Sequence, residues 1–307
     1  MRSIDPRWWL RTSSMLICSF LLFHCEEPVE LNIDVPKSRL VINSSFYPNQ
    51  LVTLRVSATR PPGTPPVNIT DARVSLFEAG KLAEELVYVP APEEGGYGSY
   101  RTRRFTPQVG SEYTIYVAAN GYDPVTAVSS IPPPVAIEEL SLSNVTTDIQ
   151  QGAMVYDYTL TVSYADPPEE QNYYDLRIYQ RVIPFRVSAK GDTIMEQAYL
   201  KSVGTPLRHS SDKTVSVLLR DLGGAKNVSV QLQSRINSKR EILAEVVAEL
   251  RTVSPEYYYY QRSINAEYLA PSNGLSEPII IFDNVDQGLG IFAGYNVVQQ
   301  HLPLVRD

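Results

Sequence analysis

Cys25 is the residue whose surroundings point most directly to chemistry. It follows an apolar run, Met15–Phe23, that is broken only by Ser19. This run of about nine residues is shorter than the roughly 20 residues of a spanning helix and is typical of a secretory signal. The basic residues that such a signal carries before its apolar run are present as Arg2, Arg7 and Arg11.

The pattern predicts a bacterial lipoprotein signal at residues 1–24, after which Cys25 becomes the N-terminus. The side chain must be cysteine because a thiolate is the nucleophile that accepts the diacylglyceryl group. Leu22 fits the usual pattern, whereas His24 stands where a small residue is usual. Two alternatives remain open, a cleaved signal with an incidental cysteine and a short anchor helix. Two or three acyl chains are sufficient for stable anchoring in a membrane.

Charge and cysteine content exclude several classes of protein. Removing residues 1–24, which carry three arginines and one aspartate, lowers the formal net charge from -7 to -9. Such an acidic chain is a poor electrostatic match for nucleic acid. Cys18 leaves with the signal and Cys25 is acylated, so the mature domains have no disulfide, no thiol nucleophile and no cysteine metal ligand.

Histidines and acidic residues offer few candidates for catalysis or metal binding. The mature chain contains only His209 and His301, and it has no Gly-x-Ser-x-Gly elbow. We interpret His209 as an ordinary loop residue and His301 as a residue of the C-terminal tail. Asp283, Asn284 and Asp286 have oxygens that suit calcium, but a polar turn explains them better. We therefore predict no catalytic residues, no metal site and no cofactor.

Carboxylate pairs that fall in loops are interpreted as ordinary solvated charge. Three carboxylate pairs occur, and neighbours in a strand point to opposite faces. The three arginines at 101, 103 and 104 are interpreted as solvated charges that keep a strand edge from pairing with another chain. This interpretation is preferred to an anion-binding site. These residues are Glu84/Glu85, Glu93/Glu94, Glu169/Glu170 and the basic group Arg101, Arg103 and Arg104.

The fold class is predicted to be mainly β, with two β-sandwich-like domains in tandem. The sequence has 20 tyrosines and 23 prolines against 8 phenylalanines, which indicates strands joined by many turns. Residues 37–132 read as an immunoglobulin-like or carboxypeptidase-regulatory-like sandwich. Its strands are expected at 40–45, 51–59, 72–78, 82–89, 100–105, 112–119 and 125–130.

Three consecutive prolines, Pro132–Pro134, mark the expected domain boundary because they cannot extend a strand ladder. Residues 135–300 read as a second, mostly β domain, in which Lys190-Gly191-Asp192 is a turn. Its strands are expected at 156–164, 173–187, 214–219, 228–234 and 244–253.

One helix is predicted at about 255–270, with Ser254 as N-cap and Pro255 in the first helical position. The stripe Tyr257, Tyr260, Ile264 and Tyr268 is expected to pack on a sheet. We also consider Tyr257, Tyr258 and Tyr259 as contacts for a partner or ligand, since tyrosine binds at low entropy cost.

The last apolar segments, around residues 279–295, flank a polar Asp/Asn/Gly turn and predict a closing hairpin, or a strand followed by a tight Gly-rich return. Gly288, Gly290 and Gly294 would allow positive φ or close approach of two backbones.

Several motifs together resemble a family of Bacteroidota lipoproteins described as domain of unknown function 4249. They are an acidic segment after Cys25, a Leu-Val-Ile strand at Leu40, Asp166-Pro167-Pro168 before Asn172-Tyr173-Tyr174, Ser254-Pro255-Glu256-Tyr257-Tyr258, and the closing Glu277-Pro278, Asn284-Val285 and Gly288–Phe292. The likeness covers essentially the whole mature chain, and the closing motif is its most specific part.

The resemblance implies a lipoprotein on the outer face of the outer membrane, next to a TonB-dependent receptor. In this group, acidic residues such as Glu26 and Glu27 in the tether 25–36 act as a surface-sorting signal; a solvated linker is the plainer interpretation. We expect a non-enzymatic accessory binding subunit of a nutrient-uptake system. The alternatives are a structural or adhesive surface lipoprotein without a transporter and, less favoured, a surface hydrolase.

Overall fold

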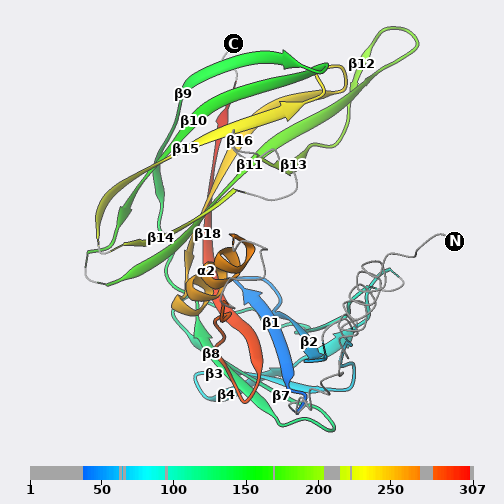
Figure 1. The fold of residues 1–307 in the computed structure, drawn as a ribbon, viewed down its shortest axis with the longest axis vertical. Coiled ribbons are helices and arrows are strands. Elements are labelled where there is room, and N and C mark those ends of the chain that lie inside the picture. Colours follow the sequence, from blue (N-terminus) through cyan, green and yellow to red (C-terminus); the bar gives the residue numbers. More distant parts are fainter. Residues whose placement is uncertain are drawn as a thin grey trace, which may run out of the picture. The chain divides into compact units, whose positions relative to one another are not determined.

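The computed structural model describes residues 37–61, 64, 67–93, 96–168, 170–203, 215–221, 223–269 and 279–304. Within these ranges the chain is mainly β, with one helix, as the sequence predicts (Figure 1). The strands form sheets of ten, five and three strands.

The first sandwich encloses a core between the five-stranded sheet and one end of the ten-stranded sheet. Leu40, Leu54, Leu76 and Ile115 are among the side chains that the core buries completely. The five-stranded sheet has the order β17 (Val285–Asp286), β8 (Val125–Ser130), β7 (Glu112–Ala118), β3 (Arg73–Glu78) and β4 (Lys81–Glu85). The facing strands are β1 (Leu40–Phe46), β2 (Thr53–Ala58), β6 (Ser99–Arg101) and β5 (Val87–Val89).

The second sandwich encloses a separate core between the three-stranded sheet and the other end of the ten-stranded sheet. Leu160, Tyr174 and Leu176 are fully buried there. The three-stranded sheet has the order β15 (Gly224–Ile236), β10 (Ala153–Asp166) and β9 (Ile137–Gln150). The facing strands are β11 (Asn172–Val187), β16 (Glu241–Val253), β12 (Thr193–Met195), β13 (Tyr199–Ser202) and β14 (Val215–Asp221).

One strand, β18 (Leu289–Pro303), belongs to both sandwiches. Its first part pairs in parallel with β1, and from Tyr295 onward it pairs antiparallel with β16. Gly290 has φ +105°, and a Cβ there would lie 2.0 Å from the Ile42 carbonyl oxygen. A Cβ on Gly294 would lie 2.2 Å from the Ser130 oxygen. The close backbone approach expected at Gly290 and Gly294 is therefore confirmed.

The predicted closing hairpin is wrong, because its two strands join different sheets. Val285 and Asp286 pair with β8, whereas β18 pairs with β1 and β16. The side chain of Asn284 fixes this arrangement, since it accepts from Phe292 N and donates to Phe292 O at 3.0 and 2.8 Å. A domain boundary at residues 132–135 therefore does not account for β17 and the first part of β18, which belong to the first sandwich.

Two strand predictions also need correction. The single strand expected at 82–89 is divided at Leu86, so that β4 pairs with β3 while β5 pairs with β6 in the other sheet. Strand β9 was not predicted, because alternation fails there: only Leu140 is buried, and its last eight residues are all exposed. Because β9 is an edge strand of a three-stranded sheet and packs little on a core, its sequence does not need to alternate between apolar and polar residues.

Candidate functional site

The helix α2 (Pro255–Leu269) begins as the sequence predicts. Ser254 caps it, with Tyr257 N donating to Ser254 Oγ at 3.4 Å and Tyr258 N to Ser254 O at 3.1 Å. Ser129 Oγ, at the end of β8, lies within hydrogen-bond distance of both Ser254 Oγ and Glu256 Oε2, at 3.2 Å from each. The start of α2 is therefore tied to the first sandwich, and Figure 1 shows the helix beside β18.

The helix tyrosines that were considered as partner contacts face mostly inward. Tyr257 and Tyr258 are 2% and 9% exposed, so their side chains cannot offer a contact surface. They pack with Tyr173, Val253 and Tyr295 in a third apolar cluster. The expected stripe is confirmed at Tyr257, whereas its member Ile264 is 37% exposed. Tyr259 is partly buried, and its hydroxyl lies 3.2 Å from the Tyr173 hydroxyl.

A cluster of buried charges lies directly beneath Tyr257. Asp175 is 0% exposed and accepts hydrogen bonds from Arg177 Nε at 2.8 Å, Ser216 Oγ at 2.6 Å and the Tyr257 hydroxyl at 2.9 Å. Arg177 and Arg251 donate to the same Tyr257 oxygen at 2.8 and 3.2 Å. The tyrosine hydroxyl thus connects one carboxylate with two guanidinium groups.

The cluster continues on β16 through Arg251 and Glu249. Arg251 Nε donates to Glu249 Oε1 at 2.6 Å, and Gln299 Nε2 donates to Glu249 Oε2 at 2.6 Å. The Arg251 guanidinium also lies 4.7 Å from the centre of the Tyr295 ring, close enough for a cation–π contact. Charges on β11 and β16 therefore balance one another, and the uncharged Tyr257 hydroxyl of α2 lies between them.

Burial raises the pKa of Tyr257, and the Asp175 carboxylate raises it further, so the phenol keeps its proton. Burial would lower the pKa of Arg177, but Asp175 and the Tyr257 hydroxyl together outweigh that effect and raise it. Each of these groups is committed to a partner inside the cluster. The arrangement can hold α2 on the sheet, and it exposes no activated acid, base or nucleophile.

The arginine group of the first sandwich surrounds an internal anion. The backbone N–H groups of Arg103, Arg104 and Phe105 all donate to the Glu84 carboxylate, at 2.7, 3.2 and 2.8 Å. Desolvation raises the pKa of Glu84, but these three bonds outweigh it and lower the pKa. Glu84 and Glu85 have different surroundings, as expected for neighbours in a strand: Glu84 accepts these backbone N–H groups, whereas Glu85 forms an exposed ion pair with Arg73 at 2.9 Å.

Several predicted residues lie outside the described part of the chain. They are Cys25, Glu26 and Glu27, together with the whole signal and tether, His209, Glu94 and Glu169. His301 lies on β18, where its Nδ1 is 3.0 Å from Glu245 Oε2 at an exposed position. In the described ranges, no three His, Cys, Asp or Glu side chains gather as ligands for a metal ion.

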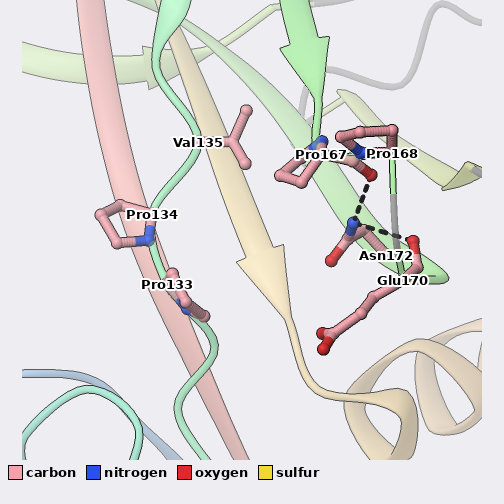
Figure 2. A pocket seen from close by; sticks show the side chains of 7 residues that line it. All are labelled: Pro133, Pro134, Val135, Pro167, Pro168, Glu170 and Asn172. Carbon is pink, nitrogen blue, oxygen red and sulfur yellow. Dashed lines mark hydrogen bonds between the residues drawn. The ribbon is translucent and has the colours of Figure 1, made fainter. Parts of the chain in front are cut away.

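A cavity of about 380 Å³ lies between the linker after β8 and the loop between β10 and β11 (Figure 2). The sequence pattern does not predict this cavity, although Asp166-Pro167-Pro168 is one of the motifs that carry the family resemblance. Its wall is mostly apolar and combines four prolines with one carboxylate and one carboxamide. The lining residues are Pro133, Pro134, Val135, Pro167, Pro168, Glu170 and Asn172.

An apolar surface covers the outer face of the ten-stranded sheet near β12. Register places Ile183 opposite Ile242, Phe185 opposite Met195, and Leu200 opposite Arg181, so these side chains and Val187 share one face. The opposite face carries the core residues Val182 and Leu243. We call Ile183, Phe185, Val187, Met195, Leu200 and Ile242 the outer apolar stripe.

Most side chains of the stripe are exposed to solvent. Val187 is 61% exposed, Met195 56%, Leu200 49% and Ile242 38%, while Ile183 and Phe185 are partly buried. Contiguous exposed apolar side chains of this kind mark interaction surfaces on soluble proteins. Sequence reasoning missed the stripe because alternation predicts which residues share a face but does not show which face is covered.

Comparison with known proteins adds a family but no activity. A family model described as "Domain of unknown function (DUF4249)" matches residues 26–301. A search of curated proteins finds none that matches. In the described part of the chain, no helix has the length and apolar character needed to cross a membrane.

Proposed function

Because the chain belongs to the DUF4249 family, we propose that it is a surface lipoprotein of the outer membrane, anchored through Cys25. In this proposal it serves as the accessory binding subunit of a TonB-dependent nutrient-uptake system, without enzymatic activity of its own. The sequence pattern that predicts a lipoprotein signal at residues 1–24 supports the anchor, and Glu26 and Glu27 support export to the outer face.

The outer apolar stripe is the observation that carries the role in assembly. It spreads over β11 and its neighbours on both sides, which corresponds to a patch about 10 Å wide and at least 13 Å long. A flat apolar patch suits the core of a protein–protein interface better than a small polar nutrient. We propose that its occupant is the transporter, whose extracellular surface would cover the stripe.

The tether would favour this contact. A lipid anchor confines the protein to the membrane surface, which raises its effective concentration near a receptor in the same membrane. The interface can therefore be modest in size and still be occupied.

A structural or adhesive role is the second candidate, and the same stripe would then meet another protein. A surface hydrolase is less favoured, because the buried carboxylates Asp175 and Glu249 are bonded to arginines in the interior. Screening the purified protein on peptide and glycan substrates addresses this third candidate.

The test is purification of the tagged protein from native outer membranes, followed by identification of any barrel that accompanies it. Met195→Lys should abolish the co-purification, because a charge would be buried in the interface. Leu82→Lys is the matched control, since Leu82 on β4 is also 56% exposed and lies outside the stripe. Equal recovery of the barrel with both variants, or recovery of none with the wild type, would contradict the proposal.

A further inference from the structure

We propose that the cavity lined by Pro133, Pro134 and Val135 on one side and by Pro167, Pro168, Glu170 and Asn172 on the other is a binding site for a small organic cation, a protonated amine or guanidinium on an apolar body. This inference rests on the proposed binding role and names the class of ligand. The volume of about 380 Å³ is at the lower end of the range for small-molecule sites. The argument depends on which groups line the cavity and how firmly they are held.

The two walls are fixed to the sheets behind them. On the linker side, Val135 is 8% exposed and its N–H donates to Thr252 Oγ1 at 3.2 Å, while Asn296 Nδ2 donates to Pro132 O at 3.3 Å. Pyrrolidine rings add stiffness because proline has a fixed φ. The linker wall is thus formed before any ligand arrives.

The loop wall is held through Asp166, which is 3% exposed. Its carboxylate accepts hydrogen bonds from the Tyr174 hydroxyl and from Gly223 N. Gly223 contacts the loop closely, since a Cβ at this residue would lie 2.6 Å from Pro168 Cα. Asp166 is therefore a positioning residue for Pro167 and Pro168.

The polar groups of the cavity are acceptors. Asn172 Nδ2 donates to Pro167 O at 3.4 Å and to Glu170 O at 3.1 Å, which uses both amide protons. Its Oδ1 remains as an acceptor, and Figure 2 shows this oxygen and the Glu170 carboxylate directed toward the space between the two proline pairs. The described residues provide no salt-bridge partner within 4.0 Å for the Glu170 carboxylate, which is exposed at the cavity mouth.

A site with only acceptors and apolar walls discriminates by charge. An ammonium or guanidinium group would donate to Glu170 and Asn172 while its carbon body packs on the prolines. An anion would meet the Glu170 carboxylate, and a neutral alcohol would satisfy at most part of the acceptor set. The net negative charge of the chain, -7 over the full sequence, favours approach of a cation.

The experiment is calorimetric titration of the detergent-solubilised full chain with benzylamine and with its neutral isostere benzyl alcohol. We expect benzylamine to bind at least roughly tenfold more tightly, as a charge-assisted hydrogen bond requires. Glu170→Gln should reduce that preference to below roughly threefold, and raised salt should weaken binding. Glu138→Gln, at an exposed position on β9, is the matched control and should leave binding unchanged.

A blocked peptide, acetyl-Gly-Lys-Gly-amide, distinguishes the source of the cation. Binding of the peptide with weak binding of benzylamine would assign the site to a lysine side chain of a polypeptide, and the reverse would assign it to a free amine. Equal affinity for amine and alcohol, or an unchanged preference in Glu170→Gln, would overturn the inference. Because the titration contains no transporter, its failure leaves the co-purification result untouched.

Discussion

The substitution Tyr257→Phe tests whether the buried charge cluster holds α2 in place. It deletes one hydroxyl from a side chain that is 2% exposed, so the phenyl ring keeps its packing. Asp175 loses a hydrogen bond of 2.9 Å, and Arg177 and Arg251 lose an acceptor at 2.8 and 3.2 Å. A hydrogen bond to a buried charge contributes about 1.5–3 kcal/mol.

The destabilisation is reduced because Arg177 and Arg251 each keep a carboxylate partner, and because their side chains are 23% and 15% exposed. We therefore expect the free energy of unfolding to fall by about 2–4 kcal/mol, which corresponds to a decrease in Tm of about 5–12 °C. The assay is urea unfolding followed by far-UV circular dichroism. Tyr259→Phe is the control, since its side chain is only partly buried and its hydroxyl meets Tyr173 and Arg220 rather than a buried carboxylate. It should lose less than about 1 kcal/mol. If the two variants unfold alike, the cluster does not hold the helix.

Two further substitutions test the shared strand and the internal anion site. Gly290→Ala should destabilise the protein by about 3 kcal/mol or more, because a Cβ there would lie 2.0 Å from Ile42 O at a positive φ. The control is Gly80→Ala, at a residue with φ +75° and open space around it, which should lose about 1 kcal/mol. Equal losses of the two variants in urea unfolding would refute the argument. The pKa of Glu84 is lowered in the folded state, so its contribution to stability is present above about pH 4.5 and is lost as the pH falls through the folded pKa. Thermal unfolding between pH 3 and 6 should consequently show a shallower acid loss in Glu84→Gln, and curves of equal slope would contradict this.

Local patterning was sufficient to predict the class of fold and most of its elements. Strand β2 alternates as expected, with Leu54, Val56 and Ala58 buried, and α2 begins at the Ser254-Pro255 signal. These elements follow from side-chain periodicity and capping, which are properties of neighbouring residues.

Features that depend on distant parts of the chain were not predictable in this way. Nothing local indicates that β18 pairs in parallel with β1, almost 250 residues earlier in the chain. Likewise, the three N–H groups around Glu84 come together only when residues 103–105 fold against β4. The cavity has the same origin, since its walls come from the linker at Pro133 and the loop at Pro167.

The outer apolar stripe shows a further limit of sequence reasoning. A strand such as β11 reads as apolar on both faces along part of its length, which normally indicates burial on both sides. Here the face with Val182 is covered, whereas the face with Val187 is 61% exposed at that residue. Only the arrangement of the second layer distinguishes a core face from an interaction surface.

The central proposal is that acylation of the Cys25 thiol holds this protein on the membrane. Mass spectrometry of the N-terminal peptide from the purified mature protein tests it most directly. The account predicts that the peptide begins at Cys25 and carries the mass of two or three acyl chains, and that Cys25→Ala is released from the membrane fraction. A mature chain that begins at another residue, or an unmodified Cys25, would contradict it.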